Sequence, residues 1–195
     1  IEIGMYRTAL IIGSECMSHL MNWKDRGTCI LFGDGAGAAI LKNSSRPFYL
    51  PIGHSDGSKK DALLLRSRHS GETENLTDPQ YYMQMDGQAV FKFAVRRVPE
   101  VIREVLEKNQ VKQEEIRFFI LHQANRRITE AVARHLKEPL DKFPMNVDHC
   151  GNTSSASIPI LLDEMNRKGE LHRGDKIVLA GFGAGLTWSA AVLEW

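Results

Sequence analysis

Three short segments carry the side chains and amides best suited to chemistry in this sequence. His122 ends the apolar run 118–121, and Asn152 stands in the small polar turn 150–154. The third segment is the glycine-rich stretch 181–188, a predicted turn whose backbone amides are free to donate hydrogen bonds. A histidine, an asparagine and exposed amides can together bind a carbonyl oxygen and stabilise negative charge on it.

The elements around these segments are of the kind that positions catalytic groups. A strand that leads into a helix fixes a side chain at the edge of a sheet and leaves it accessible. The bulky run 118–121 predicts such a strand, and apolar residues at helical spacing predict the following helix at 125–136. Further helices are predicted at 157–168 and at 86–108, and Pro99 is expected to kink or interrupt the latter.

Shorter apolar runs, bounded by glycine or polar residues, predict the remaining strands. These runs are 8–13, 28–32, 38–41, 49–52, 62–65, 175–180 and 186–193. A loop is expected at 14–27, a turn at 33–37, and a surface excursion at 43–80, where Ser, Gly, Asp and Lys are frequent. Because strands and helices alternate, the sequence predicts an α/β fold with a layered, mostly buried sheet.

The bulk composition is ordinary and gives no sign that nucleic acid or a membrane is a partner. The chain has 195 residues, a formal net charge of +1 and 43% hydrophobic residues, so it has no bulk attraction to a polyanion. No apolar run approaches the roughly 18 residues that a membrane span requires, and no signal peptide is visible. Because the sequence opens without methionine, we expect it to begin inside a larger protein.

The three cysteines, Cys16, Cys29 and Cys150, are widely spaced and odd in number. This pattern argues against a disulfide framework and for a reducing compartment. Each cysteine is interpreted as structural, because Cys29 lies within a predicted strand and the sequence places no base beside Cys150. No two histidines have the spacing of a zinc-binding helix, so no metal is expected. His122 alone fits a satisfied core histidine as well as a catalytic one.

Gly33, Gly35 and Ala38 match the G-x-G-x-x-A pattern of dinucleotide-binding sites. A phosphate site requires a helix directly after such a turn, whereas the residues that follow, 39–41, favour a strand. We therefore interpret these glycines as a tight turn that lets two backbones approach closely.

Two arginines break a local rule of helix electrostatics. Arg126 and Arg127 fall in the first turn of a predicted helix, where the helix dipole disfavours cations. Such violations often mark functional sites. The further members of a possible basic patch are Lys92, Arg96, Arg97 and Arg134. The alternative interpretation is a solvated helical face without a partner.

Four ordered blocks of the sequence resemble one known family. They are G-D-G-A-G-A-A-I-L at 33–41, L-H-Q-A-N-R-R-I at 121–128, G-N-T-S-S-A-S-I-P at 151–159 and G-F-G-A-G-L-T-W at 181–188. These blocks resemble β-ketoacyl-acyl-carrier-protein synthase III, a thiolase-fold condensing enzyme that starts type II fatty-acid synthesis. The resemblance implies a thiolase-like layered α/β fold. Residues 1–80 would be the end of the N-terminal half with a connecting insertion, and residues 81–195 the C-terminal half, a mixed sheet packed by helices.

The resemblance also implies a Cys-His-Asn active site, to which this chain contributes His122 and Asn152. None of its cysteines matches the family's nucleophile, which lies upstream, so we expect the chain alone to be inactive. The amide of Ala184 matches a donor of the family's oxyanion hole at a position that is often glycine. Alanine disfavours positive φ, so the turn would be strained if this position required a positive φ.

Other positions match the family's substrate and partner contacts. Those that match the coenzyme A entrance and the acyl pocket are Arg26, Met85, Gly87 and Phe91. Those that match the carrier-protein-binding surface are Lys92, Gln123, Ala124, Asn125, Arg126, Arg127 and Arg134. An acidic carrier protein would explain a basic patch on a nearly neutral chain.

The implied activity is decarboxylative condensation of a short acyl-coenzyme A with malonyl-acyl-carrier protein. It needs no cofactor beyond the coenzyme A thioester that serves as substrate. The resemblance further implies a cytoplasmic homodimer completed by the missing N-terminal half. Two alternatives stay open: a related condensing enzyme of a secondary pathway, and a non-catalytic half that only binds carrier protein or a partner subunit.

Overall fold

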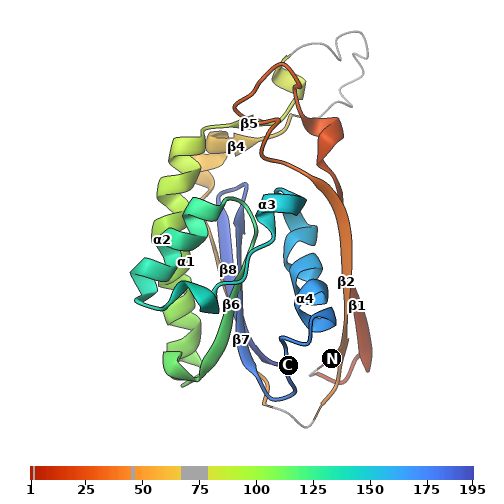
Figure 1. The fold of residues 1–195 in the computed structure, drawn as a ribbon, viewed down its shortest axis with the longest axis vertical. Helices are drawn as coiled ribbons and strands as arrows, with labels where there is room; N and C mark the ends of the chain where they lie inside the picture. The colour runs from red at the N-terminus through yellow and green to blue at the C-terminus, as the bar shows by residue number, and fades with distance from the viewer. Residues whose placement is uncertain (2, 45–46, 67–78) are drawn as a thin grey trace.

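The computed structural model of the protein describes residues 1, 3–44, 47–66 and 79–195 (Figure 1). Its largest sheet has four strands in the order β3-β8-β7-β6. These strands span Ile52–Ser55 (β3), Ile116–Leu121 (β6), Lys176–Gly183 (β7) and Thr187–Glu194 (β8). β6 and β7 run parallel and the other pairs run antiparallel, so the sheet is mixed. The predicted strand before His122 and the predicted strands at 175–180 and 186–193 are confirmed.

Helices α1 (Gly87–Lys108) and α2 (Arg126–Leu136) cover one face of this sheet (Figure 1). Both begin within one residue of the predicted position because a local cap fixes each start. The Asp86 carboxylate accepts hydrogen bonds from two amides in the first turn of α1. The Asn125 side chain accepts one from the amide of Arg127 in α2.

α1 runs through Pro99 as one helix, so the expectation that Pro99 interrupts this helix is wrong. A proline inside a helix removes a backbone hydrogen bond and costs about 3 kcal/mol relative to alanine. The neighbouring side chains Val98, Val101 and Ile102 are all 0% exposed. Burying each such side chain contributes roughly 2 kcal/mol, so packing against the sheet outweighs the local penalty.

Helix α4 (Ser157–Arg167) lies on the other face of the four-stranded sheet (Figure 1). Beyond it is a second sheet of two antiparallel strands, β1 (Thr8–Cys16) and β2 (Asp34–Lys42). The layers therefore alternate helix, sheet, helix, sheet, and α4 has a sheet on each side. This arrangement confirms the predicted layered α/β class. The four-stranded sheet is largely buried, whereas most residues of β1 and β2 are exposed in this chain.

The predicted turn at 33–37 is wrong, because β2 begins at Asp34 and runs through Gly35 and Gly37. Gly37 pairs with Gly13 of β1. A Cβ atom on Gly37 would lie 2.8 Å from the Cβ of Pro159, and one on Gly13 would lie 2.6 Å from the carbonyl oxygen of Ser155. The glycines therefore do allow a close approach of two backbones, but they do so within a sheet that packs on the start of α4.

Two further expectations for this region are also wrong. β1 extends to Cys16, into the predicted loop, and residues 28–31 form turns where a strand is predicted. The Asp25 carboxylate accepts hydrogen bonds from the Thr28 hydroxyl at 2.7 Å and from the Gly27 amide at 2.9 Å. Such side-chain contacts compete with strand pairing and curl the chain into turns.

The remaining elements are short. β4 (Leu63–Leu64) lies within one predicted run and pairs with β5 (Gln84–Met85), and α3 spans Val147–Cys150. The 3-10 helices span Met17–Leu20, Gly57–Ala62, Pro79–Tyr81, Gln113–Glu115, Leu140–Lys142 and Ser154–Ala156. Residues 67–78 of the predicted surface excursion lie outside the described residues.

The strand predicted at 49–52 instead begins at Ile52, because the Leu50 amide is taken by the Asn109 side chain at 2.7 Å. β3 thus joins a sheet otherwise built from residues after 80, and the division of the chain at residue 80 stays a prediction. Within the described ranges, no helix combines the length and the apolar character that crossing a membrane requires.

Candidate active site

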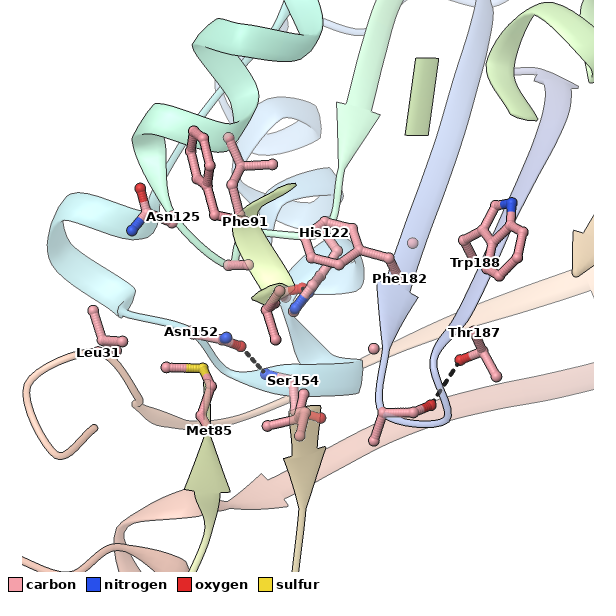
Figure 2. Close-up of a pocket in the computed structure, with 18 of the residues that line it drawn as sticks. Leu31, Met85, Phe91, His122, Asn125, Asn152, Ser154, Phe182, Thr187 and Trp188 are labelled. Carbon is pink, nitrogen blue, oxygen red and sulfur yellow. Dashed lines mark hydrogen bonds between the residues drawn. The ribbon is translucent and has the colours of Figure 1, made fainter. Parts of the chain in front are cut away.

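A pocket of about 1480 Å³ opens where the carboxyl ends of β6 and β7 meet the starts of α1 and α2 and the segment after α3 (Figure 2). Its lining includes His122, Asn152 and Ala184, one from each segment singled out in the sequence. Because β6 and β7 are parallel neighbours, the residues that follow them share one edge of the sheet. The fold therefore brings the three segments together.

His122 is held from three sides. Its backbone amide donates to the Ala180 carbonyl oxygen at 2.8 Å, which continues the β6–β7 pairing by one residue. Its ring meets the ring of Phe182 edge to face, with centroids 5.4 Å apart. Its Nδ1 atom lies 2.6 Å from the Oγ atom of Ser157, which is buried. Burial lowers the pKa of His122 to about 4, so the imidazole is neutral at neutral pH.

The Ser157 hydroxyl assigns the tautomer of His122. The Gln123 amide donates to Ser157 Oγ at 3.3 Å, and among the described residues His122 Nδ1 is the one acceptor that the Ser157 hydroxyl hydrogen reaches. With Nδ1 accepting, the ring proton lies on Nε2. Among the described residues nothing pairs with Nε2, and Figure 2 shows the imidazole directed into the pocket. Nε2 is therefore available as a neutral hydrogen-bond donor.

Asn152 is held by a segment far away in the sequence. Its backbone amide donates to the Leu31 carbonyl at 2.8 Å, and its carbonyl accepts from the Gly33 amide at 3.0 Å. Its side-chain Oδ1 accepts from the Ser154 amide at 2.9 Å (Figure 2). With Oδ1 occupied, the Nδ2 group is the donor that remains for the pocket.

The backbone around Asn152 is strained, as is common at functional sites. Ser154 has a φ of 49° and Gly151 has a φ of 69°. The left-handed region costs a non-glycine residue roughly 1–2 kcal/mol, so packing must hold Ser154 there. Two neutral donors are thus fixed in one pocket, an arrangement that suits an oxygen on which negative charge develops.

Ala184 lies in the turn between β7 and β8, on the same pocket. Its carbonyl accepts a hydrogen bond from the Thr187 hydroxyl at 3.1 Å. The positive φ of this turn, 133°, falls on Gly185, and Ala184 is not among the residues with positive φ. Alanine therefore fits this position without the backbone strain that a positive φ would cause.

The expected substrate positions divide into two groups. Met85, Gly87 and Phe91 line the pocket, and the Arg127 guanidinium lies over the Phe91 ring at 5.7 Å. Arg26 is exposed and lies outside the pocket lining. The structure thus brings the proposed acyl-pocket residues to His122 but does not bring Arg26 there.

The basic positions differ in how their charges are balanced. Arg126 bonds to Glu130 at 3.1 Å and to Asp148 at 3.0 Å, so its unfavourable place at a helix start is offset within the chain. Arg127 and Lys92 line the pocket and have no ion pair with any described residue.

The remaining basic positions lie outside the pocket lining. Arg96 and Arg97 both pair with Glu100. Arg134 is exposed on α2, and no described acidic group pairs with it.

Gln123 does not fit its expected contact with a carrier protein, because its side chain is buried. Gln123 is 1% exposed, donates to the Leu121 carbonyl at 2.7 Å and accepts from the Asn146 amide at 3.1 Å. Its neighbours Ala124 and Asn125 line the pocket, and Asn125 also caps α2.

The cysteines lie away from the pocket lining. Cys16 is exposed and Cys29 is half-buried in a turn, so the prediction that Cys29 lies within a strand is wrong. Burial and the nearby Glu164 carboxylate raise the pKa of the Cys150 thiol, which disfavours the nucleophilic thiolate.

Sequence reasoning missed Ser157 and Phe182 as parts of the site. Ser157 opens α4 and is 2% exposed. Its signal was a polar residue in the first helical turn four positions before the buried Leu161, which places both on the inward face. A polar side chain on that face requires a buried partner.

Two family models match the chain. The C-terminal model of 3-oxoacyl-[acyl-carrier-protein (ACP)] synthase III matches residues 106–195, and the model of 3-oxoacyl-[acyl-carrier-protein (ACP)] synthase III matches residues 1–56. A β-ketoacyl-[acyl-carrier-protein] synthase III of Clostridium novyi is 46% identical over 201 residues, covering 100% of this chain and 61% of that protein.

Solved structures show the same likeness. The 3-oxoacyl-[acyl-carrier-protein] synthase III of Aquifex aeolicus has a TM-score of 0.90 at 41% identity, covering 100% of this chain and 60% of that one. The priming β-ketosynthase of the R1128 polyketide pathway has a TM-score of 0.91 at 33% identity, covering 98% of this chain and 58% of that one. The chain thus spans about 60% of the length of these relatives.

Proposed function

The chain belongs to the 3-oxoacyl-[acyl-carrier-protein] synthase III family and has its thiolase-like fold, and we propose that it serves decarboxylative carbon–carbon bond formation in fatty-acid synthesis. One observation carries the proposal. His122 and Asn152 each have one side-chain atom tied within the protein and one donor left for the same pocket. That arrangement suits a thioester oxygen that gains negative charge.

The proposed reaction joins an acyl group, held on a cysteine thiol that this chain does not supply, to a malonyl thioester. Loss of carbon dioxide from the malonyl group leaves an enolate, whose carbon attacks the acyl carbonyl. The carbon–sulfur bond of the acyl-enzyme then breaks, and the cysteine leaves as the thiolate, which carries the negative charge of the enolate. The donors on His122 Nε2 and Asn152 Nδ2 stabilise the enolate oxygen, so they act on charge that is absent from the ground state.

The neutral state of His122 supports this role. A pKa of about 4 keeps the imidazole uncharged at neutral pH, and the Ser157 contact keeps its proton on Nε2. A neutral donor stabilises an enolate without transferring a proton to it. Protonation would destroy the carbon nucleophile before it attacks the acyl carbonyl. The Ala184 amide is the proposed donor to the other oxyanion, which forms during acyl transfer to the cysteine.

The proposed substrates are a short acyl-coenzyme A and a malonyl-acyl-carrier protein, and the enzyme is proposed to act as a homodimer. Cations without an ion pair in the described part of the chain are the proposed contacts to acidic groups. Lys92 and Arg127 lie at the pocket, and Arg134 lies further along α2. These three cations are the proposed contacts to the carrier protein, and Arg26 is the proposed contact to the phosphates of coenzyme A.

A second candidate is priming condensation in a secondary pathway. The likeness to the R1128 priming β-ketosynthase favours it. Both candidates use the same oxygen site and differ in the acyl starter and the carrier protein. Comparing rates with acetyl and longer acyl-coenzyme A, and with carrier proteins of fatty-acid and polyketide synthesis, separates them.

The nucleophile is tested first on the 195-residue chain alone. We expect no acyl-enzyme after incubation with labelled acyl-coenzyme A, as read by intact mass, because the three cysteines lie outside the pocket lining. Stoichiometric acylation of any of them would show that the nucleophile is in this chain. A polypeptide that joins this chain to the N-terminal part of a relative is then expected to form the acyl-enzyme and the ketoacyl product.

A further inference from the structure

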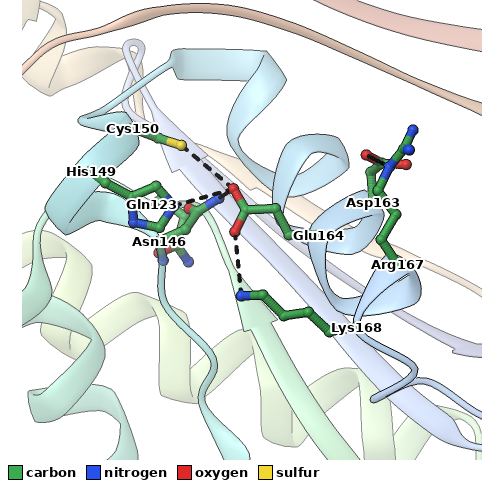
Figure 3. A network of polar contacts seen from close by, with 8 residues as sticks. All are labelled: Gln123, Asn146, His149, Cys150, Asp163, Glu164, Arg167 and Lys168. Carbon is green, nitrogen blue, oxygen red and sulfur yellow. Dashed lines mark hydrogen bonds and ion pairs between the residues drawn. The ribbon is translucent and has the colours of Figure 1, made fainter.

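A cluster of three ligand-type side chains lies between α3 and α4 (Figure 3). His149 and Cys150 come from α3, and Glu164 comes from α4. His149 Nε2 lies 3.3 Å and Cys150 Sγ lies 3.6 Å from the same oxygen, Oε1 of Glu164. All three ligand atoms lie within 4.8 Å of one another.

These separations match the edges of a zinc coordination tetrahedron. With Zn–N and Zn–O distances of about 2.0 Å and a Zn–S distance of about 2.3 Å, tetrahedral geometry separates N from O by about 3.3 Å and S from O by about 3.5 Å. Two of the three edges are therefore already formed. We propose that His149, Cys150 and Glu164 form a Zn²⁺-binding site. Within the described residues no other trio of such side chains is this close.

The charges and contacts around the cluster support a divalent cation. Glu164 and a deprotonated Cys150 would balance the two positive charges of zinc, and His149 would bind as the neutral imidazole. The side-chain Nδ2 group of Asn146 donates to Glu164 Oε1 at 3.1 Å and so orients the carboxylate from outside the ligand set. Lys168 lies 3.9 Å from the other carboxylate oxygen, but it is exposed and able to swing away.

The exposed side chain of His149 leaves the fourth coordination position open to water or to a further ligand. Cys150 is followed directly by Gly151 and Asn152. A metal bound here would tie α3 to α4 and fix the segment that leads into Asn152. The inference stands on the cluster alone and does not depend on the proposed condensing activity.

The test is metal binding to the chelator-treated protein. We expect a single equivalent of Zn²⁺ to bind by calorimetry, and Co²⁺ to give the absorption bands of a tetrahedral thiolate complex. The Cys150→Ser variant should lose the thiolate-to-cobalt band, because it removes the sulfur ligand. Cys16→Ser and Cys29→Ser should keep it, and loss of the band in either of these would overturn the proposal.

A second set of variants covers the other ligands without disturbing the core. His149→Gln and Glu164→Gln should weaken Zn²⁺ binding at least about tenfold, as removal of even an outer contact commonly does. The matched control is His172→Gln, which alters an equally exposed histidine beside Asp175. Absence of saturable binding, or equal affinity in His149→Gln and His172→Gln, would overturn the assignment.

Discussion

The Nδ1 atom of His122 lies 2.6 Å from the Oγ atom of Ser157, and this contact joins the end of β6 to the first turn of α4. The two residues are 35 positions apart in the sequence, so only the packing of α4 on the sheet brings them together. Because the hydroxyl hydrogen is directed at Nδ1, Ser157 determines which ring nitrogen faces the pocket as a donor.

Ser157→Ala should therefore slow condensation by about tenfold or more, since the lost hydrogen bond leaves Nδ1 unpaired and both tautomers accessible. Acyl transfer to the cysteine should change little. Nitrogen-15 NMR of the imidazole should show a mixture of tautomers, which a purely structural role would not produce. Ser155→Ala is the matched control, because Ser155 lies in the same segment but bonds to Glu15. A single, unchanged tautomer in Ser157→Ala would remove this role.

His122→Ala and Asn152→Ala, in a polypeptide that contains the nucleophile, should each abolish most condensation. Loss of one oxyanion donor costs on the order of a hundredfold or more in rate. Transfer of the acyl group to the cysteine should be spared to a larger degree, because that step uses the Ala184 amide. Rapid-quench measurement of the two half-reactions checks this, with the exposed Asn166→Ala as control. Equal loss of both half-reactions would show that His122 and Asn152 do not act mainly in condensation.

The buried imidazole should make folding stability depend on pH. Its pKa is about 4 in the folded protein, and an unfolded histidine titrates near 6.5. The unfolded chain binds the extra proton first, so stability is lost as pH falls from about 6.5 towards 4, by roughly 3 kcal/mol in all.

Denaturant titration at several pH values in this window measures that slope. His122→Gln should remove this part of the slope, whereas His172→Gln, in an exposed turn, should keep it. Identical slopes in the protein and in His122→Gln would show that His122 is not held neutral by burial.

Arg127→Glu should weaken the use of malonyl-carrier protein strongly, because Arg127 lies at the pocket without an ion pair among the described residues. The Michaelis constant for acyl-coenzyme A should barely change, since its proposed contact is Arg26. The effect should shrink at high salt, because exposed charges are screened over roughly 10 Å at 0.1 M.

Arg173→Glu makes the same charge change just before β7, at the far end of that strand from the pocket, and is the control. If Arg127→Glu raised both Michaelis constants equally, or if salt made no difference, α2 would present only a solvated face.

Gly33→Ala should displace the segment that holds Asn152. A Cβ atom at Gly33 would lie 2.1 Å from the carbonyl oxygen of Cys150, which is backbone and cannot swing aside. We expect a loss of roughly 1–3 kcal/mol in unfolding free energy, together with reduced condensation. Gly57→Ala is the control, because a Cβ there meets nothing within 4 Å. Equal stability of the two variants would show that the contact relaxes without effect.

Local signals in the sequence predicted the helices and part of the site. Asp86 and Asn125 cap α1 and α2 through their own neighbours, so both starts could be read within one residue. The placement of His122 beyond a buried strand was likewise readable. The strand through Gly35 and Gly37 was not, because the neighbours that exclude a side chain there, Pro159 and Ile160, come from α4.

The polar contacts of the site were the least predictable part. Gln123 looked like a surface residue beside His122, yet its side-chain oxygen accepts a hydrogen bond from the backbone amide of Asn146 in the core. Arg126 is paired with Glu130, four positions on in the same helix, and also with Asp148, which α3 brings to it. The Asn146 and Asp148 partners lie 23 and 22 positions away from Gln123 and Arg126, so no local pattern carries these two contacts, whereas the Glu130 pair was readable from helical spacing.

The bridge between Phe32 and Asn152 joins positions about 120 residues apart, and contacts of such separation form late because a long loop must close first. The backbone hydrogen bonds of α1 and α2 are local, and the packing of these helices on the four-stranded sheet does not require that closure. During refolding, the helical signal should therefore be nearly complete while the pocket still lacks one of its two donors. Formation of the complete oxygen site, with both His122 and Asn152 in place, is therefore expected to be the last step of folding, later than the formation of the helices.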